Sequence, residues 1–138
     1  MKKKLNCVLL VDDDNDCNYL HRRLLNKMGC TELVQVAVDG REALNFLTST
    51  IDGNHPVPAV IFLDINMPRM NGWDFLEEYK NLDEALKAKI ALIMLTTSLN
   101  PDDRERAKNY GDVSGFYNKY LTKETLNKIL NDHFPEYF

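Results

Sequence analysis

Short apolar runs recur five times along the chain and constrain its fold more than any other feature. They occupy residues 7–11, 33–37, 59–63, 90–95 and 115–118, with helical spacing of apolar residues between them. Runs this short, bounded by turn residues and rich in β-branched and aromatic side chains, are typical of buried parallel strands. Five strands each followed by a helix predict an α/β doubly wound (βα)5 sandwich. The common strand order is then 2-1-3-4-5.

Local signals place the helix ends. Gly29 is expected to stop the first helix near Met28, and Pro101 fits the first turn of the fourth. The third helix is predicted from Trp73 towards Leu82, and Thr122 is a cap candidate for the last.

Length and charge limit the classes of function. The 138 residues predict a single domain over residues 1–138, with a core of about 6–134 and no output domain. A net charge of −4 argues against a nucleic-acid partner, and no apolar run approaches the roughly 20 residues of a membrane span. Cys7, Cys17 and Cys30 show no CxxC spacing, and we expect reduced thiols in a cytoplasmic protein without a signal peptide.

Polar side chains follow four of the predicted strands. Asp12 and Asp13 follow the first, Asp64 the third, Thr96 the fourth and Lys119 the fifth. Alone, Asp64 is better explained as a solvated helix cap or turn residue. Ligands of open parallel sheets, however, bind outside the carboxyl ends of the strands, where these groups converge.

The convergence of these groups predicts a particular chemistry. Three crowded carboxylates repel one another unless a cation intervenes, and Mg²⁺ prefers oxygen ligands of this kind. Together with a hydroxyl and an ammonium group, they are the parts needed for phosphoryl transfer to a carboxylate such as that of Asp64.

On these residues the chain resembles the receiver domains of response regulators in two-component signalling, which have the flavodoxin-like, CheY-like fold. The resemblance covers about residues 6–134. It is carried by four segments: VLLVDDD (8–14), IFLDINMPRMNGWDFL (61–76), IMLTTS (93–98) and GFYNK (115–119).

The resemblance implies a role for each residue of the acidic cluster. Asp64 would be the phosphoacceptor, and a Mg²⁺ cofactor would be bound by Asp64, by Asp13 directly and by Asp12 through water. Asn66 would contribute its backbone carbonyl to the metal. Asp14 begins the first helix, where its charge complements the helix dipole, and is left out of the metal site.

The resemblance also implies a switch. Thr96 would hydrogen-bond a phosphoryl oxygen, Lys119 would neutralise another, and Phe116 would rotate inward. The rotation would remodel the face formed by the fourth helix, fifth strand and fifth helix. Phe116 is equally compatible with an ordinary core aromatic in both states. The family usually has proline after the lysine, whereas Tyr120 follows Lys119 here, so this peptide bond is either trans or cis and held by its surroundings.

The resemblance implies a module rather than an enzyme, limited to its own phosphorylation and autodephosphorylation. Its partners would be a sensor histidine kinase or histidine phosphotransfer protein and an unknown downstream protein, with the chain a monomer or a switch-dependent dimer. Two alternatives stay open: a scaffold that binds partners without phosphorylation, and a phosphatase with an Asp nucleophile. Asn66 stands where such a phosphatase would carry its second acid. His21 and His133 fall in predicted helices with no acidic or nucleophilic partner in register, so neither is predicted to be phosphorylated.

Overall fold

The computed structural model describes residues 4–50, 52–89, 91–98 and 100–135, so residues 1–3 and 136–138 of the expected domain and residue 90 of the expected fourth strand lie outside the described residues. The elements in chain order are β1 (Leu5–Val11), α1 (Asn15–Met28), β2 (Thr31–Ala37), α2 (Gly40–Thr48), β3 (Val60–Asp64), α3 (Gly72–Tyr79), the 3₁₀ helix η1 (Glu84–Leu86), β4 (Ala91–Thr96), α4 (Pro101–Ala107), β5 (Gly115–Asn118) and α5 (Lys123–His133). The strands form a parallel sheet in the order β2-β1-β3-β4-β5. The predicted fold and strand order are therefore confirmed.

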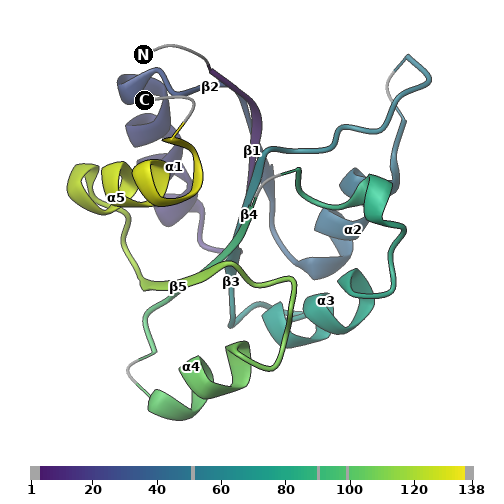
Figure 1. The fold of residues 1–138 in the computed structure, drawn as a ribbon. Helices are drawn as coiled ribbons and strands as arrows, with labels where there is room; N and C mark the ends of the chain where they lie inside the picture. Colours follow the sequence, from purple (N-terminus) through teal and green to yellow (C-terminus); the bar gives the residue numbers. More distant parts are fainter. Residues whose placement is uncertain (1–3, 51, 90, 99, 136–138) are drawn as a thin grey trace.

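The sheet separates two layers of helices. In Figure 1, α1 and α5 cover one face of the sheet, and α2, α3 and α4 lie on the other side. Each face has its own apolar core: Leu25 of α1 and Ile129 of α5 belong to the first, and Leu47 of α2 and Phe75 of α3 to the second. The central strands β1, β3 and β4 are thus covered on both sides, which is why they read as continuous apolar runs.

The predicted helix signals act as expected at α1. The side chain of Asp14 accepts hydrogen bonds from the backbone N–H groups of Asp16 and Cys17. At the other end Gly29 adopts a φ of 62°, in the left-handed region that ends many helices. The two ends of α1 are therefore set by local sequence.

Three predicted boundaries were wrong. Strands β1 and β2 both begin earlier than expected, because Leu5 pairs with Thr31 ahead of the apolar runs. Helix α3 ends at Tyr79 instead of continuing to Leu82, since the N–H of Leu82 donates to the Tyr79 carbonyl only three residues back, at 3.0 Å. The chain there tightens into a turn.

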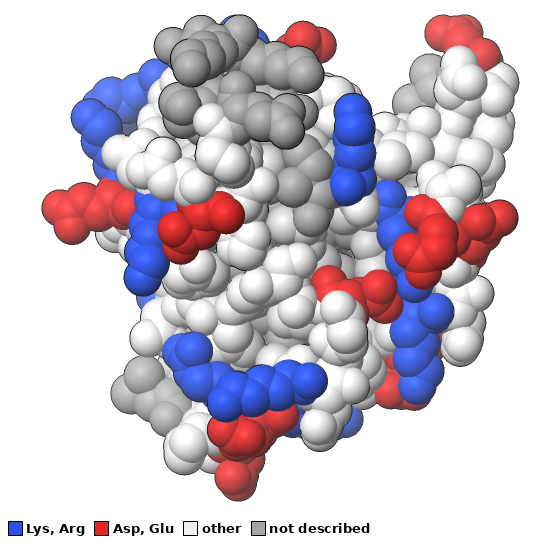
Figure 2. Space-filling model, viewed as in Figure 1, with Lys and Arg blue, Asp and Glu red and all other residues white. Residues whose placement is uncertain are grey.

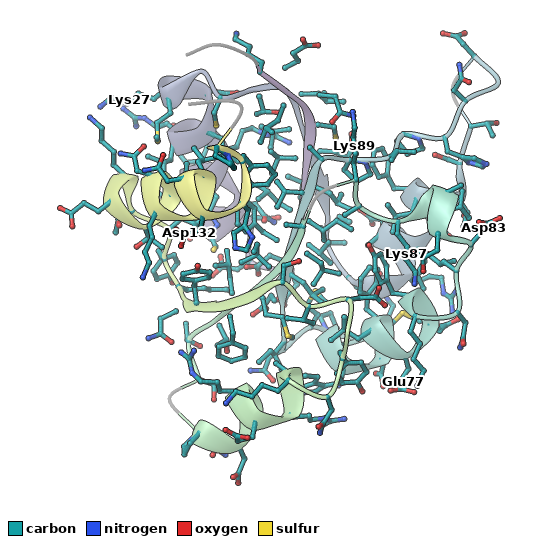
Figure 3. The ribbon with its side chains drawn as sticks, in the orientation of Figure 1. Lys27, Glu77, Asp83, Lys87, Lys89 and Asp132 are labelled. Carbon is teal, nitrogen blue, oxygen red and sulfur yellow. The ribbon has the colours of Figure 1, made fainter. Side chains whose placement is uncertain are left out.

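A buried lysine joins two loops far from the strand ends. Lys87, labelled in Figure 3, lies in the segment between α3 and β4. It is 7% exposed, and its ammonium lies 3.0 Å from Glu84 and 3.3 Å from Asp112. It also donates to the Lys80 carbonyl and lies over the Tyr79 ring. This cation ties the segment after α3 to the segment before β5.

On the face shown in Figure 2, acidic and basic side chains are interspersed around the rim. Within the described ranges, none of the helices has both the length and the apolar character required to cross a membrane.

Candidate functional site

The strand order brings the predicted acids together. Because β1 and β3 are neighbours, Asp12 at the end of β1 lies beside Asp64 at the end of β3. Carboxylate oxygens of Asp12, Asp13 and Asp64 all lie within 4.8 Å of one another. Asp12 and Asp64 are buried, at 5% and 6% exposure, whereas Asp13 is exposed. One side of the cluster is therefore open to solvent.

Lys119 closes the buried side of the acidic cluster. Its Nζ lies 2.6 Å from Asp12 Oδ2 and 3.2 Å from Asp64 Oδ1, and its side chain is 7% exposed. The backbone N–H of Lys119 donates to the Thr96 carbonyl at 2.8 Å, which fixes the end of β5 against β4. The Lys119–Tyr120 peptide bond is cis, the second of the two possibilities left open by the sequence.

The electrostatics of the cluster follow from its burial. Desolvation and the neighbouring charge of Asp12 raise the pKa of Asp64 from 3.8 to about 6, although Lys119 opposes the rise. Burial lowers the pKa of Lys119, but its hydrogen bond to Asp12 and the charges of Asp64 and Asp12 outweigh burial and raise it above its usual range. The ammonium therefore stays charged, while the surroundings of Asp64 make its ionised form less favourable than it would be in water.

A glycine shapes the loop that follows Asp64. The N–H of Gly72 donates to the Ile65 carbonyl at 2.8 Å. A Cβ at this position would lie only 2.5 Å from the Asp64 carbonyl oxygen, so any other residue would displace the loop. The side chain of Asn71 caps α3 just before it. Asn66 lies exposed in the same loop, two residues after Asp64.

Thr96 and Phe116 lie on neighbouring strands. Thr96 ends β4 with no exposed surface, and its hydroxyl accepts a hydrogen bond from the Ser98 N–H at 2.9 Å. Phe116 of β5 is half-buried, with the Arg104 guanidinium of α4 lying 4.9 Å from its ring centroid. The two residues thus connect the strand ends to the face of the molecule that bears α4.

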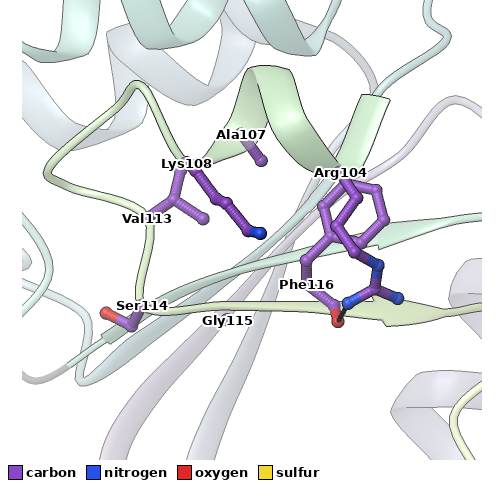
Figure 4. Close-up of a pocket in the computed structure, with 7 residues that line it drawn as sticks. All are labelled: Arg104, Ala107, Lys108, Val113, Ser114, Gly115 and Phe116. Atoms are coloured by element: carbon purple, nitrogen blue, oxygen red, sulfur yellow. Dashed lines mark hydrogen bonds between the residues drawn. The ribbon is translucent and has the colours of Figure 1, made fainter. Parts of the chain in front are cut away.

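A pocket of about 240 Å³ lies between α4 and β5 beside Phe116. In Figure 4 the Phe116 ring rises from β5 towards α4, with Arg104 against it. Arg104 also donates to the Phe116 carbonyl at 3.4 Å. Lys108 lines the pocket together with the apolar side chains of Ala107 and Val113. The ring and the guanidinium therefore form one wall of this pocket.

Sequence reasoning missed two polar residues on the inner face of α1. Asn18 donates from Nδ2 to the Asp12 carbonyl at 2.8 Å. His21 accepts the backbone N–H of Leu121 at 3.0 Å, and the Cys17 thiol lies 3.6 Å from its Nδ1. The expectation that His21 has no nucleophilic partner in register was wrong, because Cys17 lies one turn earlier on the same face of α1. The sequence signal that could have revealed these contacts is that Asn18 and His21 lie three residues apart on the otherwise apolar face of α1.

The donor set fits a hard divalent cation. All three acidic side chains offer oxygen, the ligand type that Mg²⁺ prefers, and the open side at Asp13 leaves room for water ligands. Lys119 compensates one of the negative charges and leaves an excess that a divalent cation would neutralise.

A doubly wound sheet with three acids and a lysine gathered at the carboxyl ends of its strands is the arrangement of a CheY-like domain. The family model of the response regulator receiver domain matches residues 8–131, and the chain belongs to this family. Domains of this family generally bind Mg²⁺ at the acidic cluster and interact with histidine kinases or phosphotransfer proteins.

Known proteins resemble most of the chain. The probable methanogenesis regulatory protein FilR2 of Methanothrix harundinacea is 34% identical over 125 residues, covering 91% of this chain and 79% of FilR2. Some other curated relatives are much longer, and the chain spans 10% to 20% of the length of two rice histidine kinases and of the transcription factor SKN7 of Candida albicans.

Solved structures show the same fold. A two-component response regulator from Cytophaga hutchinsonii superposes with a TM-score of 0.82 at 29% identity, covering 94% of this chain and 97% of that one. The phosphorylated cyanobacterial phytochrome response regulator RcpA superposes with a TM-score of 0.73 at 26% identity, covering 92% and 89%.

Proposed function

We propose that this chain is a phosphorylation-operated response regulator of a two-component phosphorelay, with Asp64 as the phosphoacceptor. The observation that carries the proposal is the position of the Asp64 carboxylate. It ends the central strand β3, lies in one cluster with Asp12 and Asp13, and has the Lys119 ammonium 3.2 Å away. Phosphorylated RcpA, a relative with the same fold, supports the same chemistry.

In the proposed reaction, an Asp64 oxygen forms a bond to phosphorus while the P–N bond of a donor phosphohistidine breaks, and the departing imidazole takes up a proton. A Mg²⁺ ion bound by Asp13, Asp64, the Asn66 carbonyl and, through water, Asp12 would neutralise charge on the phosphoryl oxygens. Lys119 would turn from Asp12 to one phosphoryl oxygen. Water would later cleave the acyl phosphate and restore the carboxylate.

The proposed output follows from the contacts of Thr96 and Phe116. The Thr96 hydroxyl accepts from Ser98 and so keeps its own proton available for a phosphoryl oxygen. We expect its movement towards that oxygen to make room for Phe116 to turn inward, away from Arg104. The pocket between α4 and β5 would then change shape, and the α4–β5–α5 face would signal by contact with a protein partner.

The proposal is tested by incubating the protein with Mg²⁺ and either a small acyl phosphate or a phosphorylated histidine kinase, followed by intact mass spectrometry. We expect the wild-type protein to gain one phosphoryl group. No phosphoryl group should be gained when EDTA is present during labelling, or in Asp64→Asn. Asp132→Asn, a change of an exposed acid on α5, is the matched control and should label normally. Labelling of Asp64→Asn at the wild-type rate would refute the assignment of Asp64. A wild-type protein that takes up no phosphoryl group would favour the phosphorylation-independent scaffold.

A further inference from the structure

His21 connects α1 to the loop that carries Lys119. Its side chain is 2% exposed, and its Nε2 accepts the N–H of Leu121, a residue 100 positions later in the chain. Leu121 lies two residues after Lys119 and directly before Thr122, which caps α5. A buried hydrogen bond between a side chain and the backbone of a remote loop restricts where that loop can lie.

Apolar and polar contacts both restrain the loop, and the side chain of Leu121 is buried in the first apolar core. The N–H of Lys119 donates to the Thr96 carbonyl, which holds the first end of the segment. Tyr120 is 51% exposed and makes an edge contact with the His21 ring, at 6.1 Å between centroids. His21 therefore supplies the polar contact at the second end of the segment.

The protonation state of His21 agrees with this role. Nε2 accepts a hydrogen bond, so the neutral ring carries its proton on Nδ1, which faces the Cys17 thiol. Burial lowers the pKa of His21 to about 4, with Asp12 opposing and Lys119 reinforcing the change. The ring is thus a neutral acceptor under ordinary conditions.

The same helix also holds the partner of Lys119. Asn18, three residues before His21, donates to the Asp12 carbonyl at 2.8 Å. Residues three apart lie on one face of a helix. This face of α1 therefore contacts the segment that carries Asp12, through Asn18, and the segment that carries Lys119, through His21. The side chains of Asp12 and Lys119 then pair with each other.

We propose that His21 is a positioning residue that keeps the Lys119 ammonium between Asp12 and Asp64. The inference rests on the proposed function, since it gives His21 a part in presenting Lys119 to a phosphoryl group. Its geometric half is measurable without phosphorylation, because a displaced Lys119 would become accessible to solvent.

The test uses three variants of His21. His21→Phe keeps a planar ring but removes the acceptor, His21→Leu is a smaller replacement should the first not fold, and His21→Gln returns an acceptor near the Nε2 position. His133→Leu, which removes a partly exposed histidine of α5, is the control. The first readout is the rate at which an amine-modifying reagent labels Lys119, followed by peptide mass spectrometry. The second is the affinity for beryllofluoride, a phosphoryl analogue, in the presence of Mg²⁺.

We expect labelling of Lys119 to rise and beryllofluoride affinity to fall by about tenfold in His21→Phe, the scale of one lost buried hydrogen bond. Affinity for Mg²⁺ alone should not fall, because the carboxylates remain. His21→Gln should bring both the labelling of Lys119 and the beryllofluoride affinity most of the way back to their wild-type values. His133→Leu should match the wild type in both. If His21 had a purely structural role, His21→Phe would lower thermal stability but would not weaken beryllofluoride binding selectively over Mg²⁺ binding.

The outcomes separate the two proposals. Unchanged Lys119 labelling in folded His21→Phe or His21→Leu would overturn the role of His21, whether or not Asp64 is phosphorylated. Faster Lys119 labelling in a protein whose wild type takes up neither phosphoryl nor beryllofluoride would uphold the positioning of Lys119 and would instead refute the proposed function.

Discussion

Replacing Asp64 by asparagine should stabilise the protein at neutral pH. The pKa of Asp64 is raised from 3.8 to about 6 by burial and by Asp12. A shift of this size corresponds to about 3 kcal/mol of destabilisation when the carboxylate is ionised. Lys119 loses one partner in the variant but keeps Asp12 at 2.6 Å. We therefore expect a net gain of roughly 2 kcal/mol at pH 7, or a rise in Tm of about 5–8 °C.

The gain should depend on pH in a defined direction. Because the pKa of Asp64 is higher in the folded than in the unfolded state, its protonated form stabilises the fold below pH 4, and this contribution is lost as pH rises through 6. Asparagine resembles the protonated carboxyl group at every pH. The advantage of Asp64→Asn should consequently be greatest above pH 7, fall to about half by pH 5 and nearly vanish at pH 4.

The assay is urea unfolding in EDTA at pH 7.5, 6, 5 and 4, which reproduces the metal-free cluster. Asp132→Asn, at an exposed position of α5, is the control and should change stability by less than about 0.5 kcal/mol. A variant that is less stable than the wild type at pH 7.5, or whose gain is the same at every pH, would show that Asp64 is not held in a costly ionised state. Addition of Mg²⁺ should reduce the difference, since the cation stabilises the wild-type carboxylates.

Four further substitutions test the site and the N-terminal cap of α2. Gly72→Ala should lose about 2 kcal/mol in urea unfolding and slow phosphoryl uptake, because its Cβ would lie 2.5 Å from the Asp64 carbonyl oxygen. Lys119→Met should lower the free energy of unfolding by about 3 kcal/mol in EDTA, because it leaves Asp12 and Asp64 without a buried cation. Mg²⁺ should restore part of this loss, and equal losses in both buffers would contradict the prediction. Asp39→Ala should lower Tm by the equivalent of about 1 kcal/mol, because its side chain caps α2, whereas Arg69→Ala should change Tm little, since the Arg69 side chain that pairs with Asp39 is 67% exposed.

The sequence predicted the acidic cluster because its members follow apolar runs. The position of Asp64 is set by a strand that is buried on both faces, and the order of the strands follows from connections that are short and right-handed. Once β1 and β3 are neighbours, Asp12 and Asp64 must meet. These are consequences of local pattern and of general rules of topology, and so they need no knowledge of side-chain packing.

The contacts of α1 with the site could not be predicted in the same way. The bond from Leu121 to His21 joins residues that are 100 positions apart, and it depends on how α1 is rotated against β1 and β5. The preference of Lys119 for Asp12 over Asp64, 2.6 Å against 3.2 Å, likewise depends on tertiary packing of a flexible side chain. Sequence periodicity indicates which face of a helix is buried but not which remote backbone group it contacts.

The position of Lys119 links the metal-free cluster to the proposed chemistry. Three carboxylates and one ammonium leave a formal charge of −2 at the strand ends. An acyl phosphate on Asp64 would replace the carboxylate charge of −1 by roughly −1.5 to −2, and so would make the cluster more negative by roughly −0.5 to −1. Lys119 lies closer to Asp12, at 2.6 Å, than to Asp64, at 3.2 Å, so it would compensate that charge better after leaving Asp12. We therefore expect phosphorylation to require both a divalent cation at the acidic cluster and the release of Lys119 from Asp12. A loop that moved freely would lose Lys119 to solvent at that step. The restraint from His21 on Leu121 limits the movement to the side chain, so that the ammonium can pass from Asp12 to a phosphoryl oxygen while the backbone of its loop stays in place.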